Sequence, residues 1–401
     1  MILTGTSRAS LGNHPNRSID CRFYEDAFHR FDPRQVRLTE AGGPIANVAR
    51  SAQRGAFAGV PRSSTEIGGR GLWLACPRGV RASRIGQMAK RMLDSPGWSG
   101  RVLAVVSGAV YLAGLGEEIL WLTHQGLPAH RRCIQAPFQT DGLCSGVGCW
   151  VRHGRLVLGD CVAIDLADAS VWEPPANCPG QATVLPLVNA GFRRFLAALG
   201  SPEVGKGLGQ AVPLIAALAR REDLPVTSPE DHLMALALRP ITRAARACLG
   251  RDTQRLIWAS EQLIGLGPGL TPSGDDYAGG LLFTVHHLKS AYPSEFGWDP
   301  EGVLDLLHKA YPLTNAISHT VLSDLAYGHG PEPLHDLLNA FLQAKPVEHL
   351  LVSVDRLTGI GHTSGWDMLA GVLTGMLLTE TVDWTPPGDI DKEMAVLLIS
   401  F

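Results

Sequence analysis

The chain has 401 residues, of which 45% are apolar and 18% are charged, and its formal net charge is −3. This length suffices for two or three domains with a large buried core. No apolar run reaches the ~18–20 residues needed to cross a bilayer, and residues 1–15 lack the apolar core of a signal peptide. The eight cysteines are scattered without zinc-ligand spacing, which is typical of free thiols, so we expect a cytoplasmic protein with no membrane segment.

Charge is distributed unevenly along the chain. Residues 1–100 hold 15 Lys and Arg against 7 Asp and Glu, and the remaining residues hold 20 against 31. The basic residues are single arginines without interleaved aromatic residues, so we expect no nucleic-acid partner. The field of the acidic remainder does not favour anions, so an anionic ligand would depend on local N–H groups, an arginine or a cation.

The first two segments of the chain differ in pattern. Residues 1–75 are short Gly-, Ser-, Arg- and Pro-rich pieces without sustained periodicity, and we predict a poorly ordered extension. Residues 76–180 contain short apolar runs that predict a small antiparallel β domain, closed by the Pro- and Gly-rich stretch 172–180. His153-Gly154 is typical of a hairpin turn. The predicted strands are 102–106, 109–112, 118–122, 146–151, 155–158 and 162–166.

Residues 181–401 show apolar residues at helical spacing, which predicts a larger α-helical domain and an α+β fold class. Ser228 followed by Pro229 is a typical helix start. The apolar run Val396–Ile399 is a candidate strand that docks on the β domain. The predicted helices are 188–199, 208–219, 228–249, 252–263, 303–310, 314–327, 333–343, 347–357, and one after each of two Gly-rich loops.

The most informative stretch is the first of these loops, residues 265–276, with the sequence GLGPGLTPSGDD. Glycines at this density let the backbone adopt positive φ and turn its N–H groups toward one point. A Gly-rich loop that leads into a helix N-terminus is typical of an anion site. Ser273 or Asp275 is the expected N-cap of that helix.

A second stretch, residues 361–371 with the sequence GHTSGWDMLAG, repeats the core of the first. Ser-Gly-Asp-Asp at 273–276 aligns with Ser-Gly-Trp-Asp at 364–367. A small residue then recurs every fourth position, which is about one helical turn, so the two helices can approach closely. We predict two related loop–helix units, packed together around a shared cleft. In each helix these residues form a stripe of small side chains on one face. The first stripe is Asp276, Gly280 and Thr284, and the second is Asp367, Gly371 and Gly375.

The aspartates of the two loops are the candidate catalytic residues. In the alignment of the two stretches, Asp276 corresponds to Asp367, whereas Asp275 corresponds to Trp366. An acid–base role would require a pKa raised by burial or by the neighbouring carboxylate. Alternatively, Asp275 and Asp276 together hold Mg²⁺, a hard ion that prefers oxygen ligands. A third alternative is that they only cap the helix, which stabilises it by about 1 kcal/mol.

Hydroxyl, amide and backbone groups of the same stretches are the candidate ligand-binding groups. No Gly-x-Ser-x-Gly or Ser-x-x-Lys motif indicates a covalent nucleophile, and a P-loop is excluded because Asp275 follows Gly274 where Lys is required. Asn315 and Ser318 share a helix face between the loops, where they either line the cleft or are polar residues of a helix start. The candidates are Gly267, Gly269, Thr271, Ser273, Gly274, Asn315, Ser318, His362, Thr363, Ser364 and Gly365.

The two stretches GLGPGLTPSGDD and GHTSGWDMLAG resemble a bacterial family of the AllH type, assigned as a subunit of oxamate carbamoyltransferase in anaerobic allantoin breakdown. The resemblance extends over about residues 100–385 and is absent from the first ~75. It implies a carbamoyltransferase subunit in purine nitrogen catabolism, with companion subunits and a small anionic substrate. Loop N–H groups would hold the phosphate of carbamoyl phosphate, and the Ser and Thr hydroxyls would orient oxamate, with catalysis by positioning and electrostatic stabilisation.

Neither loop contains the Arg or Lys expected for phosphate, so a companion subunit is expected to supply it. Two other hypotheses stay open. In one, the chain is an Mg²⁺-dependent hydrolase with the metal on Asp275 and Asp276. In the other, it is a ligand-binding or scaffold subunit without chemistry of its own.

Overall fold

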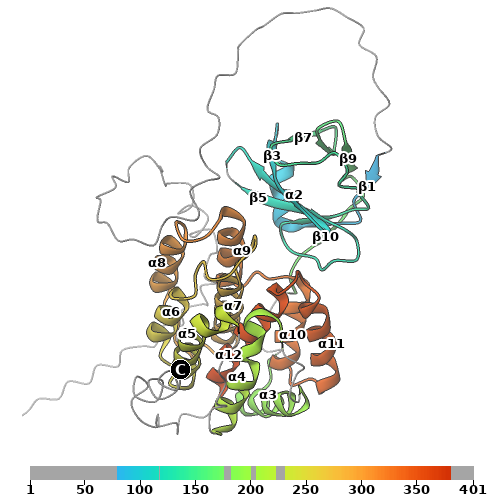
Figure 1. Cartoon of the computed structure of the whole chain (residues 1–401). Helices are drawn as coiled ribbons and strands as arrows, with labels where there is room; N and C mark the ends of the chain where they lie inside the picture. The colour runs from blue at the N-terminus through green and yellow to red at the C-terminus, as the bar shows by residue number, and fades with distance from the viewer. Residues whose placement is uncertain (1–78, 117, 176–181, 200–204, 223–230, 381–401) are drawn as a thin grey trace, which may run out of the picture. The chain divides into compact units, whose positions relative to one another are not determined.

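The computed structural model describes residues 79–116, 118–175, 182–199, 205–222 and 231–380, all of which belong to one compact unit (Figure 1). The predicted extension 1–75, the predicted helix start at Ser228 and Pro229, and the predicted strand Val396–Ile399 lie outside the described residues. In the ranges given, no helix is both long and apolar enough to span a membrane.

Residues 80–172 form a ten-stranded curled sheet in the order β1-β9-β8-β7-β3-β4-β5-β6-β2-β10, with helix α2 (Gln87–Leu93) inserted after β2. Its strands are β1 (Val80–Arg81), β2 (Arg84–Gly86), β3 (Ser99–Val106), β4 (Ala109–Gly114), β5 (Ile119–Thr123), β6 (Cys133–Gln135), β7 (Gly148–Arg152), β8 (Arg155–Leu158), β9 (Val162–Asp165) and β10 (Ser170–Trp172).

The sheet is mixed, so the prediction of a purely antiparallel sheet was wrong. The six predicted strands are present and pair antiparallel with one another, and the predicted hairpin turn is confirmed by the positive φ of both His153 and Gly154. However, β5 pairs parallel with β6, β1 with β9, and β10 with β2. Parallel pairing needs a crossover rather than a tight turn. The additional strands have only two or three residues, too few to show a period.

The two faces of the sheet bury different cores, because successive side chains of a strand point to opposite sides. From β4 and β5, Val110, Leu112 and Leu120 pack in a core with α2. From the same strands, Ile119 and Trp121 pack on the other face with Ile317 of a helix from the C-terminal half. This second face therefore lies against the helices.

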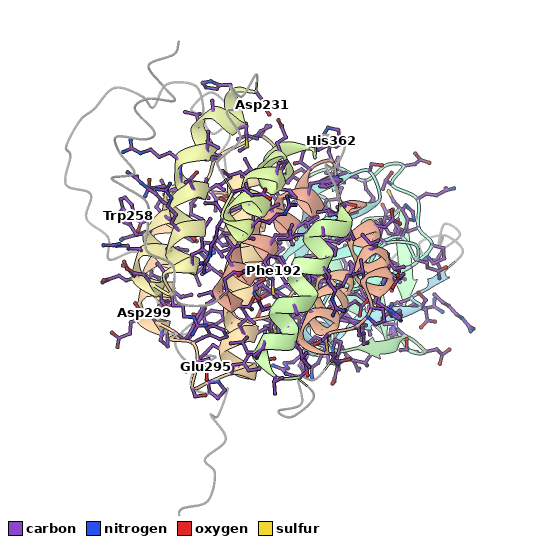
Figure 2. The ribbon with its side chains drawn as sticks, turned by 90° about the horizontal axis from the view of Figure 1, so that it is seen from below. Phe192, Asp231, Trp258, Glu295, Asp299 and His362 are labelled. Atoms are coloured by element: carbon purple, nitrogen blue, oxygen red, sulfur yellow. The ribbon has the colours of Figure 1, made fainter. Side chains whose placement is uncertain are left out.

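Eleven α-helices occur in the described residues, ten of them after the sheet, and their buried residues form one large core (Figure 1). Figure 2 shows Phe192 of α3 among the helices, whereas Trp258 of α6 is exposed at the outside. The fold is thus α+β. The later helices are α3 (Leu185–Leu199), α4 (Val212–Arg220), α5 (His232–Leu249), α6 (Thr253–Glu261), α7 (Ser273–Ala291), α8 (Pro300–Ala310), α9 (Ala316–Ala326), α10 (Glu332–Leu342), α11 (Val347–Thr358) and α12 (Ser364–Met376), with short 3₁₀ helices η2 (Gly207–Ala211) and η3 (Leu377–Thr379).

Helix starts follow local capping chemistry. The predicted start at Asp252 is confirmed, because its side chain accepts from the Arg255 N–H at 2.9 Å. Asp231 caps α5 by accepting from the Leu233 N–H at 3.0 Å (Figure 2). The predicted helix 208–219 is divided between η2 and α4.

A charged cluster anchors the sheet to α9. Arg132, which precedes β6, donates to both carboxylate oxygens of Asp324, from Nε at 2.6 Å and from Nη2 at 2.9 Å, and Arg131 Nη2 donates at 2.8 Å. Asp324 is buried, yet the two guanidinium groups hold its pKa well below the usual range. Because removing one partner of a buried ion pair is costly, this contact fixes α9 against the sheet.

Candidate functional site

Helices α7 and α12 cross in close contact at glycine residues. A Cβ atom on Gly280 would overlap the carbonyl oxygen of Met368, and one on Gly371 would overlap that of Tyr277. Only glycine permits this backbone approach. The predicted close packing of the two small-residue stripes is therefore confirmed, and it brings the N-terminal turns of the two helices together.

The two loop–helix units also share a local construction ahead of their helices. A Cβ atom on Gly274 would overlap the Leu263 carbonyl, and one on Gly365 would overlap the Leu357 carbonyl, so each Ser-Gly step lies directly against the preceding chain. The first loop has three residues with positive φ, at 76°, 112° and 108°, namely Gly265, Gly267 and Gly269. Gly361 has φ 63° in the second loop.

The prediction that Ser273 or Asp275 is the N-cap of α7 was wrong. The cap position is Pro272, and Ser273 is the first helical residue, with no side-chain capping bond. The Asp275 carboxylate instead accepts from the Gly265 N–H at 2.6 Å, from Ser318 Oγ at 2.6 Å, and from the Thr314 hydroxyl. Both carboxylate oxygens of Asp275 therefore accept hydrogen bonds from residues outside α7. These bonds tie the Gly-rich loop to the start of α9.

Asn315 and Ser318 take part in the same attachment. Asn315 caps α9 by accepting from the N–H groups of Ile317 and Ser318 at 3.0 and 3.1 Å, and its Nδ2 donates to the Leu270 carbonyl at 2.7 Å. Ser318 is buried and donates to Asp275. These contacts agree with the alternative that the two residues belong to a helix start, from which they hold the loop in place.

Asp276 and Asp367 form a pair of buried carboxylates, 1% and 0% exposed. Asp367 Oδ1 accepts from the Leu208 N–H at 2.6 Å, but Oδ2 of Asp367 and Oδ2 of Asp276 have no hydrogen-bond partner in the described part of the chain. Burial, and then the negative charge of Asp367, raises the pKa of Asp276 well above its usual range. Burial also raises the pKa of Asp367, to about 6. Two acceptor atoms are thus buried without donors, which is unusual and costly.

Hydroxyl groups from both loops adjoin these carboxylates. They form two cross-unit pairs, Thr271 Oγ1 with Ser364 Oγ at 3.0 Å and Ser273 Oγ with Thr363 Oγ1 at 3.5 Å. The first pair adjoins Asp276 and the second adjoins Asp367, and the nearby hydroxyls partly offset the rise in each pKa, although none of them lies within hydrogen-bond distance of the two unpaired carboxylate oxygens. The predicted residues of the two loops therefore come together, except that His362 is exposed (Figure 2).

A third glycine-rich segment reaches the site, and sequence analysis missed it. Residues 205–209 read Gly-Lys-Gly-Leu-Gly, the same alternation of glycines as at 265–269. Gly207 has φ 54° and lies so close to Asp367 and Thr363 that a Cβ atom would overlap both. The segment supplies the Leu208 N–H that donates to Asp367, and exposed Lys206 directly precedes Gly207 in the sequence. The alternation of glycines was a signal in the sequence, but the apolar residues that follow it led to the prediction of a helix over 208–219.

The hydrogen bonding of Asp275 and Asp276 bears on the hypothesis that these two residues hold Mg²⁺. Asp275 already accepts three hydrogen bonds, so of the two proposed ligands only Asp276 has an unpaired oxygen. Among the residues that the structure describes, no group of three or more His, Cys, Asp or Glu side chains is arranged to hold a metal ion.

Comparison with known proteins supports the resemblance. Residues 263–376 match the model of a family described as oxamate carbamoyltransferase subunit AllH. The matched range contains both loop–helix units and the helices between them, but neither the sheet nor the segment 205–209. No solved structure matches the chain.

Proposed function

We propose that this chain is a subunit of a carbamoyltransferase that acts on oxamate and carbamoyl phosphate in allantoin nitrogen catabolism, and that its paired loop–helix units bind the small anionic substrate. The family match over residues 263–376 supports the class of enzyme and the need for companion subunits. The observation that supports the ligand site is the pair of unpaired, buried oxygens on Asp276 and Asp367.

Buried acceptors without donors select a ligand that brings N–H groups. Oxamate carries an amide nitrogen with two N–H donors, which suits the two free carboxylate oxygens. Its carboxylate suits the hydroxyls of Thr271, Ser273, Thr363 and Ser364. A ligand of this kind would supply donors to the two carboxylate oxygens that have no partner among the described residues.

The raised pKa of Asp276 gives that carboxylate the character of a general base. In the proposed reaction, the oxamate nitrogen attacks the carbonyl carbon of carbamoyl phosphate. A nitrogen–carbon bond forms, the bond from that carbon to the phosphate oxygen breaks, and inorganic phosphate leaves. Asp276 accepts the proton that the nitrogen loses. Positioning by the two loops and electrostatic stabilisation of the tetrahedral intermediate would supply the catalysis.

Lys206 is the candidate cation for the phosphate. Neither loop of the matched range carries Lys or Arg, whereas Lys206 directly precedes Gly207, which lies against Asp367. Lysine acts on phosphate as a point charge. This chain would then contribute a phosphate contact itself, in addition to whatever a companion subunit supplies.

A thermal-shift series on the full chain tests the proposal. Oxamate, carbamoyl phosphate and Mg²⁺ are added singly and together to the wild-type chain, to Asp276→Asn, and to the matched control Asp355→Asn on the exposed face of α11. A ligand at 100 times its Kd adds about 2.7 kcal/mol of apparent stability. Stabilisation by oxamate or carbamoyl phosphate that is lost only in Asp276→Asn is expected. Stabilisation by Mg²⁺ alone would favour the hydrolase, and no stabilisation by any of the three would favour the scaffold.

A further inference from the structure

Helix α12 carries a tryptophan directly before its buried aspartate, at the position where the first unit has Asp275. In the first unit, the Asp275 carboxylate accepts from the Gly265 N–H at 2.6 Å and so holds the Gly-rich loop. Trp366 has no such acceptor, but it contacts the glycine-rich segment 205–209. A Cβ atom on Gly209 would lie only 2.9 Å from Cβ of Trp366 and 3.1 Å from Cε3 of its indole ring. In both units, therefore, the residue before the paired aspartate contacts a Gly-rich segment.

The same segment supplies a backbone donor to Asp367. Leu208 is fully buried, and its N–H donates to Asp367 Oδ1 at 2.6 Å. Gly207 lies so close that a Cβ atom on it would overlap the same oxygen. The segment therefore occupies Oδ1, and Oδ2 of Asp367 is the oxygen without a partner among the described residues. The orientation of this unpaired oxygen depends on where the segment lies.

The segment also contacts the hydroxyl groups of the two loops. A Cβ atom on Gly207 would lie 2.9 Å from Cβ of Thr363, whose hydroxyl pairs with Ser273 Oγ at 3.5 Å. Glycines have no side chains with which to hold a backbone in place, and they lose more conformational freedom on folding than other residues do. A tryptophan supplies a large, rigid contact at a low cost in entropy. The indole of Trp366 is thus suited to fix this stretch of backbone.

We propose that Trp366 is a positioning residue, which holds the segment 205–209 against Asp367 so that the second oxygen of Asp367 faces the ligand. This rests on the proposed function and extends it, because it assigns the orientation of one binding carboxylate to a segment outside the matched range 263–376. Trp366 itself makes no contact with the ligand in this arrangement.

The test is titration calorimetry of oxamate into the full chain, comparing wild type with Trp366→Ala and Trp366→Phe. Alanine removes the indole and releases the segment, so binding is expected to weaken about tenfold, as for the loss of one ligand hydrogen bond. Phenylalanine keeps an aromatic ring against Gly209 and should restore most of the wild-type affinity. Trp258→Ala, which removes an indole that is 51% exposed on α6 (Figure 2), should bind oxamate as wild type does.

The pH profile of binding separates positioning from a general loss of structure. The Leu208 N–H favours the ionised form of Asp367 and so lowers its pKa. When Trp366→Ala releases this donor, the pKa of Asp367 should rise above about 6, so that oxamate affinity falls at a higher pH than in wild type. The titratable groups of the neighbouring elements are the same in both proteins and do not produce this shift. These groups are Asp276 of α7, Lys206 of the segment and His362 of the second loop.

Gly209→Ala disturbs the same contact from the side of the segment. Its Cβ would overlap Trp366, so the same loss of affinity and the same shift in the pH profile are expected. Weaker binding in either variant without a shift in the pH profile would assign the effect to the fold and overturn the positioning role. Wild-type affinity in Trp366→Ala would also overturn it and leave the proposed function standing. Failure of the wild-type chain to bind oxamate or carbamoyl phosphate would contradict the proposed function and this inference together.

Discussion

Replacing Asp367 by Asn should stabilise the unliganded protein while weakening ligand binding. The folded-state pKa of Asp367 is raised to about 6, from 3.8 for the ordinary carboxyl. The folded state therefore binds a proton more tightly than the unfolded state, so the carboxyl destabilises the fold increasingly as pH rises from below 3.8 to above 6. A difference of about 2 pKa units corresponds to about 3 kcal/mol at pH 7.5, as an order of magnitude.

Asparagine retains the oxygen that accepts from the Leu208 N–H and removes the charge that faces Asp276. The variant should therefore gain about 3 kcal/mol at pH 7.5 but only about 1 kcal/mol at pH 4.5, where the wild-type carboxyl is largely protonated. Urea unfolding with linear extrapolation at the two pH values measures both gains. Asp355→Asn, at an exposed position of α11, serves as the control and should show neither. A gain that is equal at the two pH values, or a loss at pH 7.5, would refute the electrostatic reasoning.

Three further changes probe the packing, the phosphate contact and the acid response. Gly280→Ala should destabilise the protein by about 1–3 kcal/mol in urea unfolding, because its Cβ overlaps the Met368 carbonyl, whereas Gly126→Ala, with open space around it, should change little. Lys206→Gln should weaken carbamoyl phosphate binding about tenfold in calorimetry but leave oxamate affinity nearly unchanged; equal effects on both ligands would argue against a phosphate contact. His130 and His335, which are buried, and His329, which is half-buried, should make stability fall as pH drops from 6.5 toward 4, because the unfolded state binds their protons more readily. A flat urea midpoint across this window would contradict their folded pKa values of about 4 for His130 and about 3 for His329 and His335.

The crossing of α7 and α12 could be predicted because it follows from local pattern. Gly280 and Gly371 each stand one turn after an aspartate, and helical geometry alone places such residues on one face. The main strands and most helices were predictable for the same reason, since each has enough residues to show its period. The loops came together because the two helices that follow them pack side by side.

Other parts of the site depend on contacts that no local pattern encodes. Asp275 looks like a helix cap in the sequence, but it accepts hydrogen bonds from Gly265 and from residues some 40 positions later, Thr314 and Ser318. Asp367 takes its backbone donor from Leu208, 159 residues earlier. Only the tertiary structure could reveal such partners, and the same applies to the parallel strands, whose pairing depends on a crossover.

The central claim is that the unpaired oxygens of Asp276 and Asp367 select a ligand by its N–H donors. Calorimetry of oxamate and oxalate, side by side on the full chain, tests it most directly, because oxalate replaces the amide nitrogen with a negatively charged oxygen at nearly the same size. The account predicts that oxamate binds and that oxalate binds at least about a hundredfold more weakly, since a ligand carboxylate would face two buried acceptors without a donor. Equal affinity for the two would contradict the claim.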